Sequence, residues 1–246
     1  MKTEQTPRLP ASYGDTAAEY AAVREHGAGV IDLSSRGRIA VGGLEAVQFL
    51  NGLITNDMKT LTEDTWMPAV FPNVQGRLIA SVRIIRLKDI QTETKTSPSY
   101  LIDTEAATRE PVLTTLQRFT LAGDFRVTDL SSQTAQFTVQ GKTADDVIQS
   151  VFANELTGLA SNGATKTTWN GSEVTVLRAR HTAADGFDVV VDESVAGSLW
   201  QALVNAGTTP VGPEAFEILR IEAGISPSTE PKLPWPSTSI RPIENG

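Results

Sequence analysis

Two pairs of strand-like segments constrain the fold of this chain most. The stretch "GRLIASVRIIRL" (76–87) carries apolar residues at every second position, the period of a half-buried strand. We interpret the polar residues 88–99 as a hairpin loop that leads into a returning strand, "YLID" (100–103). A second hairpin is predicted over residues 165–180, because Asn170-Gly171 separates two strand-like runs and Asn-Gly is a strong signal for a tight turn.

Segments with helical apolar spacing alternate with these strands. Strand-like runs followed by helical ones, with antiparallel hairpins between them, predict a fold of the α+β class. The predicted helices cover residues 16–26, 44–54, 104–121, 144–152, 193–207 and 212–224.

The composition excludes several classes of site. The 246 residues include no cysteine, which rules out disulfides, thiolate zinc sites and cysteine-ligated iron–sulfur clusters within this sequence. The net charge of −8 disfavours nucleic-acid binding, which needs a basic face. The N-terminal residues lack the apolar core of a signal peptide, and no apolar run is long enough to span a membrane. We therefore expect a cytoplasmic protein that contacts neither membranes nor nucleic acid.

Generic catalytic motifs are missing from the sequence. It has no P-loop, no G-x-G-x-x-G after a strand and no G-x-S-x-G elbow. His26 and His181 are the only histidines, so the H-E-x-x-H motif and a two-histidine iron site at motif spacing are excluded. We therefore expect no metal site, and generic chemistry alone indicates no reaction.

Four stretches, taken in order, resemble the folate-binding domain of the glycine-cleavage T-protein (aminomethyltransferase, GcvT) superfamily. They are "GVIDLSSRGRIAVGGLEAVQFLNGLITNDMKTL", "FPNVQGRLIASVRIIRL", "HTAADGFDVVV" and "LRIEAGI". Within the superfamily, the N-x-Q-G-R form at 73–77 resembles the YgfZ branch of folate-dependent iron–sulfur assembly or repair factors. The T-protein itself usually has a Gly-rich stretch followed by acidic residues there.

The resemblance implies a domain organisation. The family's folate-binding domain consists of two intertwined α+β subdomains with antiparallel sheets, which we place at residues 1–225, with residues 30–128 nested in the remainder. The family continues into a C-terminal barrel domain, which we expect this sequence to lack. Residues 226–246 are rich in proline and diverge from the family, so they are predicted to form an extended tail.

The resemblance also implies a tetrahydrofolate site, for the free cofactor or a one-carbon derivative. Asp57 matches the family's acidic residue at the reactive edge of the folate, where it manages protons as N5 attacks the methylene of an aminomethylated lipoyl arm. We therefore assign Asp57 a catalytic and folate-binding role. Asn73 matches a residue that contacts the pterin, and Arg220 matches an arginine that lines the same cavity.

The third matching stretch supplies two more predicted ligands. Asp188 falls where the family has an acidic residue, usually glutamate, whose carboxylate pairs with the two neighbouring donors of the pterin. His181 replaces the usual tyrosine and keeps the ability to stack or to form a hydrogen bond. Ala183 and Ala184 replace the usual Gly-Glu, which changes the expected shape of this loop.

Each of these residues also has a structural interpretation. Asp57 and Asn73 are compatible with a polar helix end and an ordinary turn. Asp188 is compatible with an outward position on a strand, and His181 with a purely structural role. Arg220 could simply pair with a neighbouring glutamate, either Glu217 or Glu222.

The function implied first is that of a tetrahydrofolate-binding, YgfZ-like protein that assembles or repairs iron–sulfur clusters, with iron–sulfur proteins as clients and no turnover of its own. The alternatives are an aminomethyltransferase of glycine cleavage and a truncated, non-catalytic remnant of either protein. The YgfZ motif K-G-C-Y-x-G-Q-E, with its cysteine, is absent from this sequence. The sequence leaves the oligomeric state open.

Overall fold

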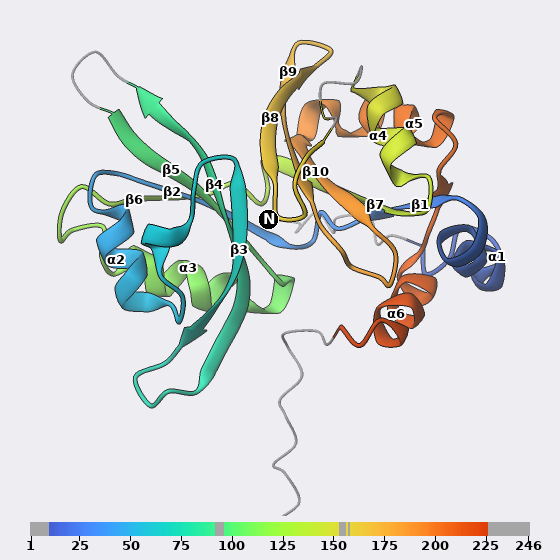
Figure 1. Ribbon diagram of the computed structural model, residues 1–246. Helices are drawn as coiled ribbons and strands as arrows, with labels where there is room; N and C mark the ends of the chain where they lie inside the picture. Colours follow the sequence, from blue (N-terminus) through green and yellow to red (C-terminus); the bar gives the residue numbers. More distant parts are fainter. Residues whose placement is uncertain (1–9, 92–95, 153–155, 157, 226–246) are drawn as a thin grey trace, which may run out of the picture.

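The computed structural model describes residues 10–91, 96–152, 156 and 158–225, which form two β-sheets flanked by helices (Figure 1). The six-stranded sheet, here called the outer sheet, has the strand order β11-β1-β7-β10-β9-β8, and only the β11–β1 pair is parallel. Its strands are β1 (Ala28–Asp32), β7 (Thr134–Gly141), β8 (Ala164–Trp169), β9 (Ser172–Arg178), β10 (Gly186–Asp192) and β11 (Thr209–Pro210).

The five-stranded sheet, here called the inserted sheet, is antiparallel, with the order β3-β4-β5-β2-β6. All of its strands lie between β1 and β7 in the sequence. The chain therefore enters this part of the fold through residues 33–36 and leaves it through residues 130–133. The strands are β2 (Gly37–Gly42), β3 (Thr65–Pro72), β4 (Leu78–Gln91), β5 (Thr96–Thr104) and β6 (Arg126–Asp129).

Helices cover one face of each sheet. Helices α2 and α3 bury their apolar sides on the inserted sheet, and α4 and α5 do the same on the outer sheet (Figure 1). Helices α1 and α6 pack together beside β1. The helices are α1 (Thr16–Ala21), continued by a π-helical turn (Ala22–His26), α2 (Ala46–Leu53), α3 (Arg109–Gln117), α4 (Ala144–Val151), α5 (Glu193–Asn205) and α6 (Pro213–Glu222), with short 3-10 turns at Met58–Thr60 and Ala106–Thr108.

The faces that helices do not cover meet each other. Ile85 and Leu101 of the inserted sheet are buried in one apolar cluster with Ala164 and Leu177 of the outer sheet. The indole Nε1 of Trp66 on β3 donates a hydrogen bond of 2.7 Å to the carbonyl oxygen of Arg178 on β9. The two sheets therefore share a partly apolar interface.

The guanidinium of Arg38 on β2 holds the two connections between the sheets together. It is fully buried and donates to the carbonyl oxygens of Ser34 and Arg36 in the first connection, both at 3.0 Å. It also donates to the carbonyl oxygens of Ser131 and Thr134 around the second connection, at 2.7 and 2.9 Å. Buried donors of this kind must be satisfied, and backbone oxygens satisfy this one.

The α+β class and the antiparallel character of the sheets are confirmed. The predicted hairpin at Asn170-Gly171 joins β8 to β9, and both residues have positive φ, at 48° and 81°, as a tight hairpin turn requires. The predicted loop over residues 88–99 was wrong in extent, because β4 continues to Gln91 and β5 begins at Thr96. The predicted tail, residues 226–246, lies outside the described residues. None of the described helices is long and apolar enough to cross a membrane.

Candidate functional site

A cavity of about 280 Å³ lies along α6, where the first connection between the sheets passes the loop before β10. We call it the α6 cavity. Among the residues predicted from the sequence, it brings together His181 and Arg220. Its wall is formed by Tyr13, Ile31, Asp32, Leu33, Ser35, Arg36, Glu105, His181, Val211, Pro213, Phe216, Glu217, Arg220 and Ile225.

Asp188 lies behind His181, on β10, and its side chain is fully buried. Its neighbours on β10, Phe187 and Val189, face the helix-covered core, so the strand alternation turns Asp188 toward the inserted sheet. His181 Nε2 lies 2.9 Å from both carboxylate oxygens, and Gln136 Nε2 donates to Oδ2 at 3.2 Å. The outward orientation that the sequence left open for Asp188 is therefore wrong.

Arg83 of β4 completes the surroundings of Asp188 by forming an ion pair with it across the two sheets. Burial would raise the pKa of Asp188, but Arg83 and His181 outweigh burial and hold the pKa well below its usual range. Asp188 is therefore ionised at neutral pH.

The same arginine continues into the inserted sheet. Arg83 Nε lies 2.8 Å from Oδ2 of Asp103, which faces it on β5, and Arg36 Nε lies 2.8 Å from Oδ1 of the same carboxylate. Arg36 in turn pairs with Glu105. The series His181, Asp188, Arg83, Asp103, Arg36 and Glu105, here called the ion-pair network, therefore begins and ends at the wall of the α6 cavity.

The members of this network determine each other's charge states. Burial would raise the pKa of Asp103, but Arg36 and Arg83 lower it below its ordinary value. Burial would lower the pKa of Arg83, yet the carboxylates of Asp103 and Asp188 raise it instead. No charge of the set is left buried without an oppositely charged partner, which would be strongly destabilising.

His181 is fixed by its own loop. Its backbone N–H donates to Gln140 Oε1 at 3.0 Å, and Thr182 Oγ1 accepts a hydrogen bond from Ala184 N at 3.2 Å. The imidazole meets the ring of Phe216 edge-on, with the ring centres 6.2 Å apart. The loop thus holds the imidazole between Asp188 and α6.

Arg220 reaches the cavity from α6. It donates to the carboxylate of Glu217, with Nε 2.9 Å from Oε2, and to the carbonyl oxygen of Ile225. Of the two glutamates that the sequence offered as partners, Glu217 is the one that this ion pair uses. The contact of Arg220 with folate stays a prediction.

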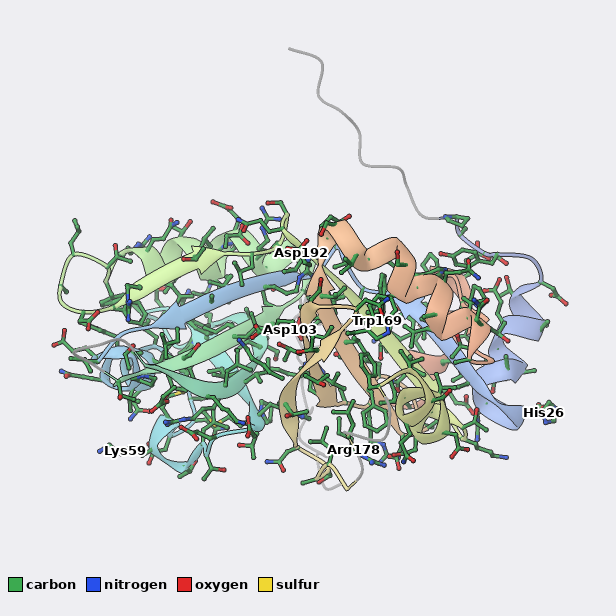
Figure 2. All side chains as sticks on the ribbon, turned by 90° about the horizontal axis from the view of Figure 1, so that it is seen from above. His26, Lys59, Asp103, Trp169, Arg178 and Asp192 are labelled. Carbon is green, nitrogen blue, oxygen red and sulfur yellow. The ribbon has the colours of Figure 1, made fainter. Side chains whose placement is uncertain are left out.

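Asp57 lies elsewhere. It is exposed, caps the short turn at Met58–Thr60 by accepting from Lys59 N at 2.9 Å, and accepts from Asn51 Nδ2 at 3.3 Å. Figure 2 shows Lys59 at the periphery of the molecule, whereas Asp103 lies between the two sheets. Asp57 lines neither the α6 cavity nor a second cavity of about 430 Å³ between the sheets.

Asn73 begins the turn between β3 and β4. Its side-chain oxygen accepts from the backbone N–H groups of Gln75 and Arg77, both at 2.9 Å, as in an Asx-type turn. It also lines neither cavity. These contacts of Asn73 and Asp57 account for their conformation, and the ligand role of each stays a prediction.

The sequence reasoning missed Arg36, Arg83, Asp103 and Glu105. A signal for two of them is visible: Arg83 stands in the apolar run "ASVRIIRL" and Asp103 ends the apolar run "YLID". A charge within a strand that is apolar on both sides needs a buried partner. The identity of that partner depends on the fold, because Arg83 and Asp188 are 105 residues apart.

The GCVT N-terminal domain family matches residues 5–229, which is most of the sequence. The chain belongs to this family. As a GCVT N-terminal domain it is 32% identical over 217 residues to an aminomethyltransferase of Rubrobacter xylanophilus, covering 88% of this chain and 56% of that protein. It is 31% identical to an aminomethyltransferase of Thermus thermophilus, covering 88% and 59%. The chain thus spans little more than half the length of these relatives.

Solved structures show the same fold for this GCVT N-terminal domain. The glycine cleavage system aminomethyltransferase T of Bartonella henselae superposes with a TM-score of 0.75 at 22% identity, over 86% of this chain and 55% of that one. A chain of the heterotetrameric sarcosine oxidase of Corynebacterium gives a TM-score of 0.51 at 17% identity, over 78% and 90%. The predicted membership of the GcvT superfamily is confirmed. The curated relatives named here are aminomethyltransferases, which favours the alternative left open by the sequence over the YgfZ branch.

Proposed function

We propose that this GCVT N-terminal domain binds tetrahydrofolate, or a one-carbon derivative of it, as part of an aminomethyltransferase of the glycine-cleavage T-protein type. One observation carries the proposal: the α6 cavity collects His181 and Arg220, two residues that the family resemblance assigns to the folate site. The aminomethyltransferase names of the relatives support the reaction class.

The size of the cavity suits a pterin. Small-molecule sites in proteins occupy about 300–1,000 Å³, and the 280 Å³ found here falls just below that range. A cavity of this size holds only part of a folate, so we place the bicyclic ring in it and the remainder of the folate outside.

The polar groups of the wall also fit. A pterin presents neighbouring N–H and amino donors, which pair with a carboxylate, and the glutamate tail of a folate pairs with arginine. Phe216 adds an aromatic ring. The charged residues at the wall are Asp32, Glu105 and Glu217, which can accept hydrogen bonds, and Arg36 and Arg220, which can donate them. Arg36 is paired with Glu105, and Arg220 with Glu217.

The direct contact of Asp188 with the pterin donors, which the resemblance implies, stays a prediction. Beside Asp188, Gln136 Oε1 is buried without a hydrogen-bond partner among the described residues, so one acceptor at this position remains for a donor to fill. His181 stands between Asp188 and the cavity, so Asp188 acts on the ligand through the imidazole as long as the two side chains stay paired.

Asp57 and Asn73 enter the proposal as contacts of the part of the ligand outside the α6 cavity. If these two residues bind folate, Asp57→Asn and Asn73→Ala should each weaken folate binding. Each substitution also removes the hydrogen bonds of one local turn, and no other change in stability is expected. Unchanged affinity in both variants removes them from the site.

Calorimetry with tetrahydrofolate under reducing conditions tests the binding proposal. Phe216→Ala opens the cavity wall and should weaken binding at least tenfold. Phe119→Ala, a matched change of another half-buried phenylalanine packed on the inserted sheet, should leave it unchanged. No heat at high micromolar ligand, with protein shown to be folded, contradicts the proposal. An assay with an aminomethylated lipoyl protein tests the transfer reaction separately.

A further inference from the structure

The imidazole of His181 has two different environments. On one side, Nε2 is 2.9 Å from both oxygens of the buried Asp188 carboxylate. On the other side, the ring belongs to the wall of the α6 cavity, and 13% of its side-chain surface is exposed. Nδ1 forms no hydrogen bond with any described residue.

The buried carboxylate determines which nitrogen carries the proton. An ionised carboxylate only accepts hydrogen bonds, so Nε2 must be the protonated nitrogen when the imidazole is neutral. Nδ1 then keeps its lone pair. The residue thus has the arrangement of a histidine oriented by a buried aspartate, in which the second nitrogen is available for proton transfer.

We propose that His181 is the proton-transferring residue of this site and that Asp188 is its positioning residue. The inference rests on the proposed function for the identity of the ligand, which is an amine-bearing pterin. Asp188 acts through His181, holding the tautomer and stabilising the imidazolium when Nδ1 takes up a proton.

The surrounding charges are compatible with this role. Behind Asp188, Arg83 of β4 keeps the carboxylate ionised, so that it stays an acceptor for Nε2–H. The edge of the Phe216 ring limits rotation of the imidazole on the α6 side. The other charged groups at the cavity wall are Asp32, Arg36, Glu105, Glu217 and Arg220.

Bound tetrahydrofolate supplies the amine nitrogen that accepts the one-carbon unit. Nδ1 takes the proton that this nitrogen loses as its new C–N bond forms. The imidazolium then returns that proton to the amine that departs as ammonia when the original C–N bond breaks. The one-carbon unit is then still bonded to the lipoyl sulfur. When the second folate nitrogen forms its C–N bond, the carbon–sulfur bond breaks, and the proton of that nitrogen passes through Nδ1 to the departing thiolate. Two C–N bonds form while one C–N and one C–S bond break, so no oxidant or reductant is required.

Nitrogen-15 NMR of the imidazole rings tests the inference directly, because His26 and His181 are the only histidines. His26 serves as the internal control. Its Nε2 lies 3.0 Å from a carboxylate oxygen of Glu25, but its side chain is 79% exposed, so water screens this pair. At a pH where both rings are neutral, His181 should show the Nε2–H tautomer alone, while His26 shows a mixture. Asp188→Asn should remove the strict preference. A predominant Nδ1–H tautomer for His181 in the unmodified protein overturns the inference, whether or not folate binds.

Adding tetrahydrofolate distinguishes this inference from a direct contact between the pterin and Asp188. If Nδ1 faces the ligand, its resonance shifts and the Nε2–H signal stays. Loss of the Nε2–H signal on binding means that the pterin has displaced His181 from Asp188, and it overturns the proposal. If tetrahydrofolate does not bind at all, the proposed function fails. The tautomer of His181 measured without ligand still tests whether Asp188 orients the imidazole.

The rate of transfer gives the second readout. General acid–base groups contribute roughly 100-fold to 10,000-fold, so His181→Gln should lower kcat at least about 100-fold while tetrahydrofolate still binds. His26→Gln should leave kcat unchanged. An unchanged kcat in His181→Gln contradicts the catalytic role.

Discussion

Arg83, on the inserted sheet, is ion-paired with Asp188, on the outer sheet, and it shares its other hydrogen bonds with Asp103 on its own sheet. One guanidinium is therefore ion-paired with two buried carboxylates that belong to different sheets. The interface between the sheets depends on this side chain as well as on its apolar contacts.

We expect Arg83→Met to destabilise the protein by about 3–5 kcal/mol, because it leaves two buried carboxylates without their shared partner. Urea unfolding measures the change. Arg24→Met is the matched control: Arg24 pairs with Glu222 at 3.0 Å, but about half of its side chain is exposed. Its loss should cost about 0–1 kcal/mol. Equal effects of the two substitutions would mean that the Arg83 pairs contribute little.

The protein should lose stability in acid. Asp103 and Asp188 have lower pKa values in the folded protein than in the unfolded chain, so the unfolded chain binds more protons as the pH falls. Their contribution is complete above the unfolded value of about 3.9 and is lost as the pH drops below it. Urea midpoints from pH 7 to pH 2 should therefore begin to fall near about pH 4 and keep falling below it. Asp103→Asn should flatten this part of the curve.

Arg38→Lys should destabilise the fold by at least about 2 kcal/mol. An ammonium group cannot reach all the carbonyl oxygens that the guanidinium satisfies, and each buried oxygen left unpaired costs about 1–3 kcal/mol. Arg126→Lys, at a side chain that is 59% exposed, should change stability by less than about 0.5 kcal/mol. Hydrogen exchange should also become faster in residues 33–36 and 130–133 of the first variant alone.

Two glycines should respond oppositely to alanine. Gly141 has a φ of +135°, and a Cβ there would lie 2.3 Å from the carbonyl oxygen of Gly27, so Gly141→Ala should cost at least about 1–3 kcal/mol. Gly197 lies within α5 with open space around it, and Gly197→Ala should stabilise by about 0.5–1 kcal/mol. Thermal unfolding of both variants checks the signs. A stabilised Gly141→Ala protein would falsify the account of this close approach.

Local sequence signals predicted much of the fold. Asn170-Gly171 predicted a hairpin because only a few residue types accept positive φ at both turn positions. The helix over residues 104–121 was predicted from its apolar spacing, and the observed α3 is shorter, at Arg109–Gln117. Pro111 is tolerated there because it is the third residue, within the first turn. The predicted loop at 88–99 was too long, since polar residues also occupy strands that project beyond the core.

The site was less predictable. The resemblance placed Asp188 and His181 together and Arg220 near them. In the structure His181 contacts Asp188 and shares the wall of the α6 cavity with Arg220. The partners of Asp188 could not be found from local pattern, because Arg83 comes from the other sheet. A lone charge in an apolar strand shows that a partner must exist, but only the three-dimensional pairing of strands identifies it.

The strand order has a consequence for how the protein is made. Strand β1 pairs with β7, and every strand of the inserted sheet lies between them in the sequence. On the ribosome, β1 therefore emerges long before its antiparallel partner β7. The inserted sheet can complete its own pairing first, and its folding brings the two ends of the insertion together. Translation thus favours an order in which the inserted sheet folds first and the outer sheet is completed afterwards beside it.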